Sequence, residues 1–180
     1  MELGDKKVQG LDYFYTLQGT LKGTNITDID PNTDPAKDAL ENTVNQYVAH
    51  DEYAFTLGFY ENDYKPIDAT IDLGAETNAY TNIAAEGLYN GNIAYTITDI
   101  PTFTTNPTRA SKYHYDQLHR IKKSENLQFD GSNFVPLFNN ADAFKTTYNY
   151  GADGNLENLI RHDKDGNIMD DLAYVWNNRR

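Results

Sequence analysis

The sequence predicts an all-β fold made mainly of antiparallel hairpins, and three observations predict it. Tyrosine is abundant, with 14 copies against 8 Phe and 1 Trp, and its ring suits a half-buried strand face from which the hydroxyl reaches water or a partner. Aromatic residues recur two positions apart, which places both side chains on one face of a strand. Gly, Asp and Asn follow them at turn-forming positions. We therefore expect one module over residues 1–180, a curved sheet or partial shell.

These features combine into a repeat in which an aliphatic residue follows the first aromatic residue by eight positions. The clearest copies lie in residues 113–127 and 148–176, and weaker ones run from Phe59 to Ile67 and from Ala85 to Ile93. The spacing predicts strand, turn and strand, with Tyr174 and Trp176 beginning a further copy. The residues that carry the repeat are Tyr13, Tyr15, Gly19, Tyr113, Tyr115, Asp116, Tyr148, Tyr150, Gly154, Asn155, Leu156, Asp163, Gly166, Asn167, Tyr174 and Trp176.

Four other stretches complete the expected chain. Asp34 as N-cap, Pro35 at the first helical position and helically spaced apolar residues predict one short helix over 35–48. Alternation over residues 53–59 predicts a strand. Residues 68–86 and 99–109 have the composition of loops or irregular edges. Residues 131–142 form a connection whose apolar side chains we expect to cover an edge or a face of the sheet.

Charge and composition argue against several classes of protein. The formal charge is −12, and residues 1–100 carry 17 acidic and 5 basic residues, while residues 101–180 carry 10 of each. An acidic surface repels phosphate, which disfavours a nucleic-acid partner. No apolar run is long enough to cross a membrane, and residues 1–10 lack the apolar region of a signal peptide. Cysteine is absent, so thiolate chemistry and disulfides are excluded.

Candidate sites for metal binding and catalysis are weak. Asp28, Asp30, Asn32 and Asp34 alternate as calcium ligands might, but the glycine and glutamate that an EF-hand loop requires are missing. None of the four histidines forms an i, i+4 metal-binding pair. A hydrolase with paired carboxylates stays open as an alternative, because the sequence does not bring two carboxylates together. We expect no metal, cofactor or catalytic residue.

The repeat resembles the RHS/YD-repeat family. Tyr148 to Leu156 is similar to the family's Tyr-x-Tyr-Asp-x-x-Gly-Asn-Leu signature, with Gly151 in place of its aspartate, and Tyr113 to Ile121 is similar to a variant found near RHS cores. Residues 13–23, 57–67 and 88–93 resemble the segment preceding the core in Bacteroidetes-type members of this bacterial family. The resemblance implies a β-sheet ribbon that spirals into a hollow shell, often around a C-terminal toxin. Neither a self-cleavage motif nor a toxin domain is present in these residues.

From this we expect a structural shell or scaffold segment of a secreted or cell-surface protein, not an enzyme. Its expected partners are the remaining repeats of the parent protein, or a second copy through the edge strands, so that it self-associates in solution. The alternative is an extracellular module that binds carbohydrate or protein through its Tyr- and Asn-rich loops. The resemblance places the protein outside the cell.

Overall fold

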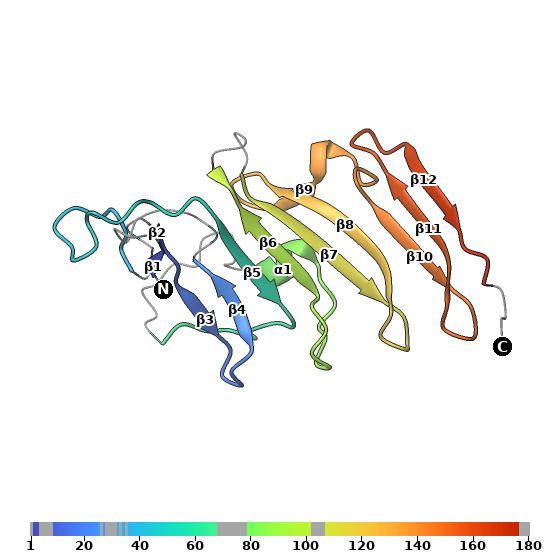
Figure 1. The fold of residues 1–180 in the computed structure, drawn as a ribbon, viewed down its shortest axis with the longest axis horizontal. Helices are drawn as coiled ribbons and strands as arrows, with labels where there is room; N and C mark the ends of the chain where they lie inside the picture. Colours follow the sequence, from blue (N-terminus) through green and yellow to red (C-terminus); the bar gives the residue numbers. More distant parts are fainter. Residues whose placement is uncertain are drawn as a thin grey trace.

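A computed structural model describes residues 2–3, 9–25, 27, 32, 34, 36–67, 79–101 and 107–176. In these residues the dominant feature is one open antiparallel sheet of ten strands (Figure 1). Its order is β12-β11-β10-β8-β7-β6-β5-β4-β3, and β9 pairs with the C-terminal end of β8. A separate pair joins β1 (Glu2–Leu3) to β2 (Gln9–Gly10). The predicted all-β class with antiparallel hairpins is confirmed.

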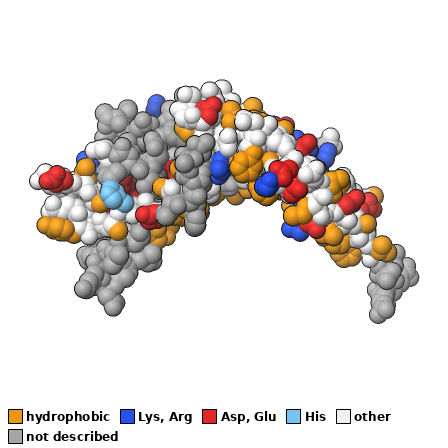
Figure 2. Space-filling model, turned by 90° about the horizontal axis from the view of Figure 1, so that it is seen from above, with side chains coloured by type: hydrophobic (Ala, Val, Ile, Leu, Met, Phe, Trp, Pro, Cys, Tyr) orange, Lys and Arg blue, Asp and Glu red, His pale blue; other side chains and the backbone are white. Residues whose placement is uncertain are grey.

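The strands follow one another in chain order across the sheet. Their bounds are β3 Tyr13–Tyr15, β4 Leu21–Thr24, β5 Ala54–Gly58, β6 Tyr95–Asp99, β7 Arg109–Tyr115, β8 Ile121–Phe129, β9 Phe134–Pro136, β10 Thr146–Tyr150, β11 Leu156–His162 and β12 Ile168–Ala173. The space-filling view shows that the molecule is arched (Figure 2), which agrees with the predicted curved sheet. Antiparallel neighbours joined by short turns make such a sheet from local contacts.

The core lies against the middle of the sheet. Buried side chains of β6 and β7, among them Tyr95, Ile97 and Ala110, pack with the helix α1 (Ala79–Ile83) and with Phe134 of β9. Residues of β5 alternate between buried and half-buried, so β5 has one face in the core and one wetter face. The connection over residues 131–142 thus contains a strand, β9, that pairs with β8 from Phe129↔Phe134 to Leu127↔Pro136.

The helix predicted over residues 35–48 is wrong. Described residues 36–47 form successive turns, and Lys37, Ala39 and Asn42 have φ of 57°, 57° and 65°, which no right-handed helix contains. Val44 and Tyr47 are 99% and 89% exposed, so the apolar side of such a helix would face water. A short helix without a covered face is unstable. Among the described residues the α-helix is α1, inside the stretch 68–86 where we expected a loop.

The two weaker copies of the repeat do not form hairpins. Residues 59–67 make a turn after β5 in which Asp63 Oδ2 accepts a 2.7 Å hydrogen bond from the Phe59 amide. Residues 85–93 are an irregular segment that leads into β6. The long connection between β5 and β6 replaces the tight turn of the other copies, although the two strands pair directly from Ala54↔Asp99 to Gly58↔Tyr95. An aromatic-to-aliphatic spacing alone therefore overpredicted hairpins.

Candidate functional site: repeat hairpins, seam and open edge

Four hairpins in the described part of the chain share one geometry, and we call them the repeat hairpins: β3–β4, β7–β8, β10–β11 and β11–β12. Each has a five-residue turn, over 16–20, 116–120, 151–155 and 163–167, and a bulge on the strand that follows it, where Lys22, Lys122, Glu157 and Met169 are the extra residues. The residues that flank the turns pair across the strands as Tyr15↔Leu21, Tyr115↔Ile121, Tyr150↔Leu156 and His162↔Ile168. The eight-residue spacing thus has a structural cause. It places the second of the two residues that lie two positions apart, such as Tyr115 after Tyr113, directly opposite the aliphatic residue.

The four turns also have the same hydrogen bonds. The first residue's amide donates to the fifth residue's carbonyl at 2.8–2.9 Å, and the fourth residue's amide donates to the first residue's carbonyl at 2.8–3.2 Å. The fourth residue has a positive φ, at Gly19 (82°), His119 (62°), Gly154 (86°) and Gly166 (80°). This is a five-residue hairpin turn with one left-handed position, where glycine has no steric penalty.

Replacing Gly19 by alanine should destabilise the protein by about 1–2 kcal/mol, because a Cβ at positive φ is strained. A Cβ at this position would meet no other atom within 4 Å, so the effect would isolate the backbone term. Gly19→Asn should cost less, since Asn tolerates this conformation. Urea unfolding followed by circular dichroism measures both variants, and equal costs for Ala and Asn would contradict the conformational explanation.

Side-chain caps complete the turns at Asp116 and Asp163. Asp116 Oδ1 accepts hydrogen bonds from the amides of Leu118 and Arg120 at 2.9 and 3.0 Å, and Asp163 Oδ1 accepts them from Asp165 and Asn167 at 2.9 Å. The backbone bond from Arg120 is the main cause that lowers the pKa of Asp116, and that from Asn167 lowers the pKa of Asp163. Gly151 offers no such oxygen at the first position of its turn, and there Asp153 Oδ1 accepts from the Asn155 amide at 3.2 Å.

These lowered pKa values predict a loss of stability in acid. A carboxylate whose pKa is lower in the folded state stabilises the fold above its unfolded pKa, near 3.9, and this contribution disappears as the pH falls through the folded pKa. The Asp163→Asn variant should therefore lose less stability than the wild type between roughly pH 6 and roughly pH 3. Thermal unfolding across this range measures the difference. Glu41→Gln, at an exposed position, controls for net charge, and an equal acid loss in wild type and Asp163→Asn would refute the assignment.

Tyrosines of the repeat connect neighbouring strands and hairpins. The Tyr115 hydroxyl donates to the Ile93 carbonyl at 2.9 Å, and the Tyr113 hydroxyl lies 3.3 Å from Thr96 Oγ1. The Arg120 guanidinium lies 4.6 Å from the centre of the Tyr150 ring and forms an ion pair with Asp116 at 2.7 Å, so one cation joins β7–β8 to β10–β11. Burial raises the pKa of both Tyr115 and Tyr150.

The tyrosines of the repeat lie in pairs on β7 and β10, which are separated by β8. The register shifts beside Tyr115 and Tyr150 leave their extra residues on the returning strands, at Lys122 and Glu157. Tyr13 and Tyr15 lie on β3 at the far edge and are partly exposed. Tyr174 and Trp176 follow β12 without being part of a strand. Their rings stack 6.4 Å apart, and Trp176 Nε1 donates to the Leu156 carbonyl at 2.7 Å.

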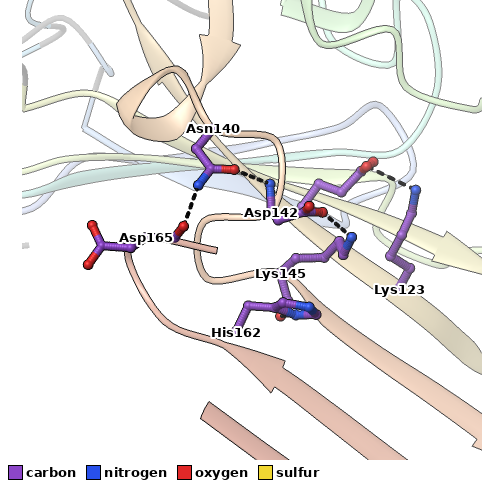
Figure 3. A network of polar contacts seen from close by, with 7 residues as sticks. Lys123, Asn140, Asp142, Lys145, His162 and Asp165 are labelled. Carbon is purple, nitrogen blue, oxygen red and sulfur yellow. Dashed lines mark hydrogen bonds and ion pairs between the residues drawn. The ribbon is translucent and has the colours of Figure 1, made fainter. Parts of the chain in front are cut away.

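A second set of contacts fastens the β11–β12 turn at the end of the strands that is opposite to the β10–β11 turn (Figure 3). In the connection between β9 and β10, Asn140 Nδ2 donates to the Asp165 carbonyl at 2.8 Å and Asn140 Oδ1 accepts from the Asp142 amide at 3.0 Å. Asp142 forms an ion pair with Lys145, whose hydrogen bond is the main cause that lowers the pKa of Asp142. The His162 amide donates to the Lys145 carbonyl at 3.0 Å. Sequence reasoning missed this set of contacts, because the two that join the connection to β11 and to its turn span 17 and 25 residues.

The seam between β8 and β10 opens into a shallow groove of about 430 Å³. These strands pair only at Thr146↔Ser124 and Thr147↔Lys123 in their described residues. His114, Lys123 and Thr147 lie opposite one another in one row. The groove is lined by Glu86, His114, Tyr115, Lys122, Lys123, Thr147, Tyr148 and Asn149.

Beside the groove, Glu125 connects the side chains of His114 and Lys123. Its carboxylate lies 2.6 Å from His114 Nε2 and accepts a 2.9 Å hydrogen bond from Lys123 Nζ. Burial acts to raise the pKa of Glu125, but the hydrogen bonds from Lys123 and His114 outweigh it and lower this pKa. The arrangement favours an ionised glutamate, and it offers hydrogen-bond donors to a polar ligand in the groove.

No group of three or more His, Asp or Glu side chains among the described residues is arranged to hold a metal ion. Asp28 and Asp30 of the calcium-like stretch lie outside the described residues. Within the same described ranges, no helix has the length and apolar character needed to cross a membrane.

The last structural feature is the open edge of the sheet at β12. Its inner side pairs with β11 from Asn158↔Ala173 to His162↔Ile168, and no described strand covers its outer side. Ile168, Met169 and Leu172 are 60%, 56% and 40% exposed. An uncovered strand with apolar side chains offers both unpaired backbone groups and an apolar surface to a partner.

Comparisons with known proteins identify no relative. A scan against protein-family models, a search of curated proteins and a search of solved structures each gave no significant match.

Proposed function

We propose that the chain is a structural segment of a larger secreted or cell-surface protein of the RHS/YD-repeat type, and that it has no catalytic activity of its own. The observation that carries the proposal is the common geometry of the four repeat hairpins, which extends to bulge, cross-strand register and turn hydrogen bonds. Units of identical geometry stack into a continuous sheet in which each contacts its neighbours. In this role the bacterial parent protein uses the chain as part of a curved wall.

The arrangement of the contacts supports a structural role more than a binding role. The contacts between hairpins, such as Arg120 with Tyr150 and Asn140 with the Asp165 carbonyl, connect one unit to the next. The residues that recur in each unit form the turns and the cross-strand pairs. The repeated residues therefore determine the shape of the sheet.

Extending the array tests this proposal. A second copy of residues 146–176 is appended to the chain, and urea unfolding is compared with that of the original. If the units are repeats, neighbouring interfaces add stability, so the extended chain should unfold at higher urea in one transition. The control appends the same segment with Gly154→Val and Gly166→Val, which should remove the gain. An extended chain that is no more stable than the control would refute a repeat architecture.

The groove at the β8–β10 seam favours a second candidate, an extracellular module that binds carbohydrate. Tyr115 and Tyr148 line it together with Asn149, Lys122 and Lys123, and aromatic rings beside hydrogen-bonding groups are what sugar recognition uses. A glycan array with the folded chain tests this, with Asn149→Ala and Lys123→Ala as variants. Hits that both variants abolish would establish the binding function, and an array without hits would eliminate it.

A further inference from the structure

The β12 edge, defined as the outer side of residues 168–173, combines apolar exposure with paired acidic residues. Ile168, Met169 and Leu172 are exposed, and Asp170 and Asp171 stand at the middle of the strand. Asp170 forms an ion pair with Arg161 of β11 at 2.6 Å, and Asp171 accepts a hydrogen bond from Asn158 at 2.7 Å. Strand β11 supplies these partners from the inner side only. The β11–β12 register therefore indicates which residue types a strand on the outer side needs at each position.

A second copy of this chain fits the edge poorly in a two-fold arrangement. Directly opposite residues of a two-fold antiparallel pair point to the same face of the sheet, so the axis of a β12 pair passes through a residue position. A two-fold axis through either aspartate would place that residue opposite itself. Like charges directly opposite one another on neighbouring strands are destabilising.

A head-to-tail arrangement of copies has the same defect. The seam between β8 and β10 shows how one repeat hairpin pairs with the next. There Lys123, ten positions after the first tyrosine of its hairpin, pairs with Thr147, the residue just before Tyr148. The equivalent residue of β12, ten positions after Ile160, is Asp170, and the residue just before Tyr13 on β3 is Asp12. Joining β12 to β3 of another copy in this register would again place aspartate opposite aspartate.

We infer that the β12 edge takes a β-strand of different sequence, one with Lys or Arg opposite Asp170 and apolar residues opposite Met169 and Leu172. This inference rests on the proposed structural function and names the partner of its open edge. On the inner side, β11 places Arg161 opposite Asp170 and Leu159 opposite Leu172, while Met169 is the extra residue of the bulge and has no residue directly opposite it. Edge charges of this kind discourage pairing with the wrong strand, and the exposed apolar side chains beside them favour pairing with the right one.

Two peptides test the inference on the full chain. One copies residues 156–162 and the other carries glutamate in place of Arg161, and binding is followed by the fluorescence of Trp176, the protein's one tryptophan. The arginine peptide should bind at least about fivefold more tightly, which corresponds to the upper range of a cross-strand charge pair. In the Asp171→Lys chain, which retains the ion pair of Asp170, this preference should shrink, and in Asp170→Lys it should reverse. Equal binding of both peptides, or binding of neither, would overturn the inference.

Sedimentation equilibrium supplies a second readout. The Asp170→Asn/Asp171→Asn chain should self-associate at least about fivefold more strongly than the wild type, because the like-charge contact is removed. Wild-type chain that self-associates as strongly as this variant would show that a second copy is the partner, and would overturn the inference. The extended-array experiment distinguishes this result from failure of the structural function, because it depends on covalently linked hairpins and not on free strands.

Discussion

Replacing Tyr95 by alanine should lower the free energy of unfolding by about 3–5 kcal/mol, the range for removing a large buried ring. Tyr95 is 2% exposed and belongs to the core cluster at the centre of the sheet. Its ring lies over Gly58, where a Cβ would collide with it. Removing the ring would leave a cavity among the core side chains, and no neighbouring group would fill it. Urea unfolding measures the effect.

Gly58 provides a sharper version of this experiment. Gly58→Ala alone should destabilise the protein by about 1–3 kcal/mol through overpacking. In the Tyr95→Ala background the added methyl should cost much less, because the ring that it would strike is gone. Tyr47→Ala, at a residue that is 89% exposed, serves as the control and should change stability by less than about 0.5 kcal/mol. Additive effects of the Tyr95 and Gly58 changes would contradict the packing described here.

Replacing Lys22 by methionine should cost about 3–5 kcal/mol, because it leaves a buried carboxylate without its cation. Lys22 Nζ lies 2.8 Å from Asp63 Oδ1, and the two side chains are 1% and 5% exposed. The amine also lies 5.8 Å from the centre of the Tyr95 ring. This pair fastens the turn after β5 to β4.

The double variant Lys22→Met/Asp63→Asn separates two effects, the loss of the Lys22–Asp63 attraction and the cost of an unpaired buried Asp63 carboxylate. Asparagine can still accept the hydrogen bond from the Phe59 amide, so the double variant should be clearly more stable than Lys22→Met alone. Lys164→Met is the matched control, since the Lys164–Asp165 pair is exposed and should contribute less than about 1 kcal/mol. If Lys22→Met cost no more than Lys164→Met in thermal unfolding, the pair would not be the buried contact described here.

Sequence reasoning was most successful where structure is local. The hairpins at Tyr113 to Ile121 and Tyr148 to Leu156 form within nine residues, and their turns depend on the conformational preferences of Gly, Asp and Asn. The glycines of such turns are compatible with bulged hairpins, but the spacing of the tyrosines does not show where the extra residue lies, which is at Lys122 and Glu157 on the returning strands. Tyr174 and Trp176, which the spacing places at the start of a further copy, follow β12 (Ile168–Ala173), and β12 itself is the edge strand in the described part of the chain.

The sequence by itself determined the all-β class, the antiparallel hairpins and the positions of their turns, since these depend on side-chain alternation and on residues close in the chain. Only the tertiary structure decided that residues 36–47 form turns and residues 79–83 a helix, because a short helix is stable only where its apolar face is covered. The same holds for Lys22 with Asp63, for the groove at the β8–β10 seam and for the acidic β12 edge. Each depends on which strands become neighbours in the sheet. Local sequence patterns do not reveal this strand order, because connections such as the one between β5 and β6 are long.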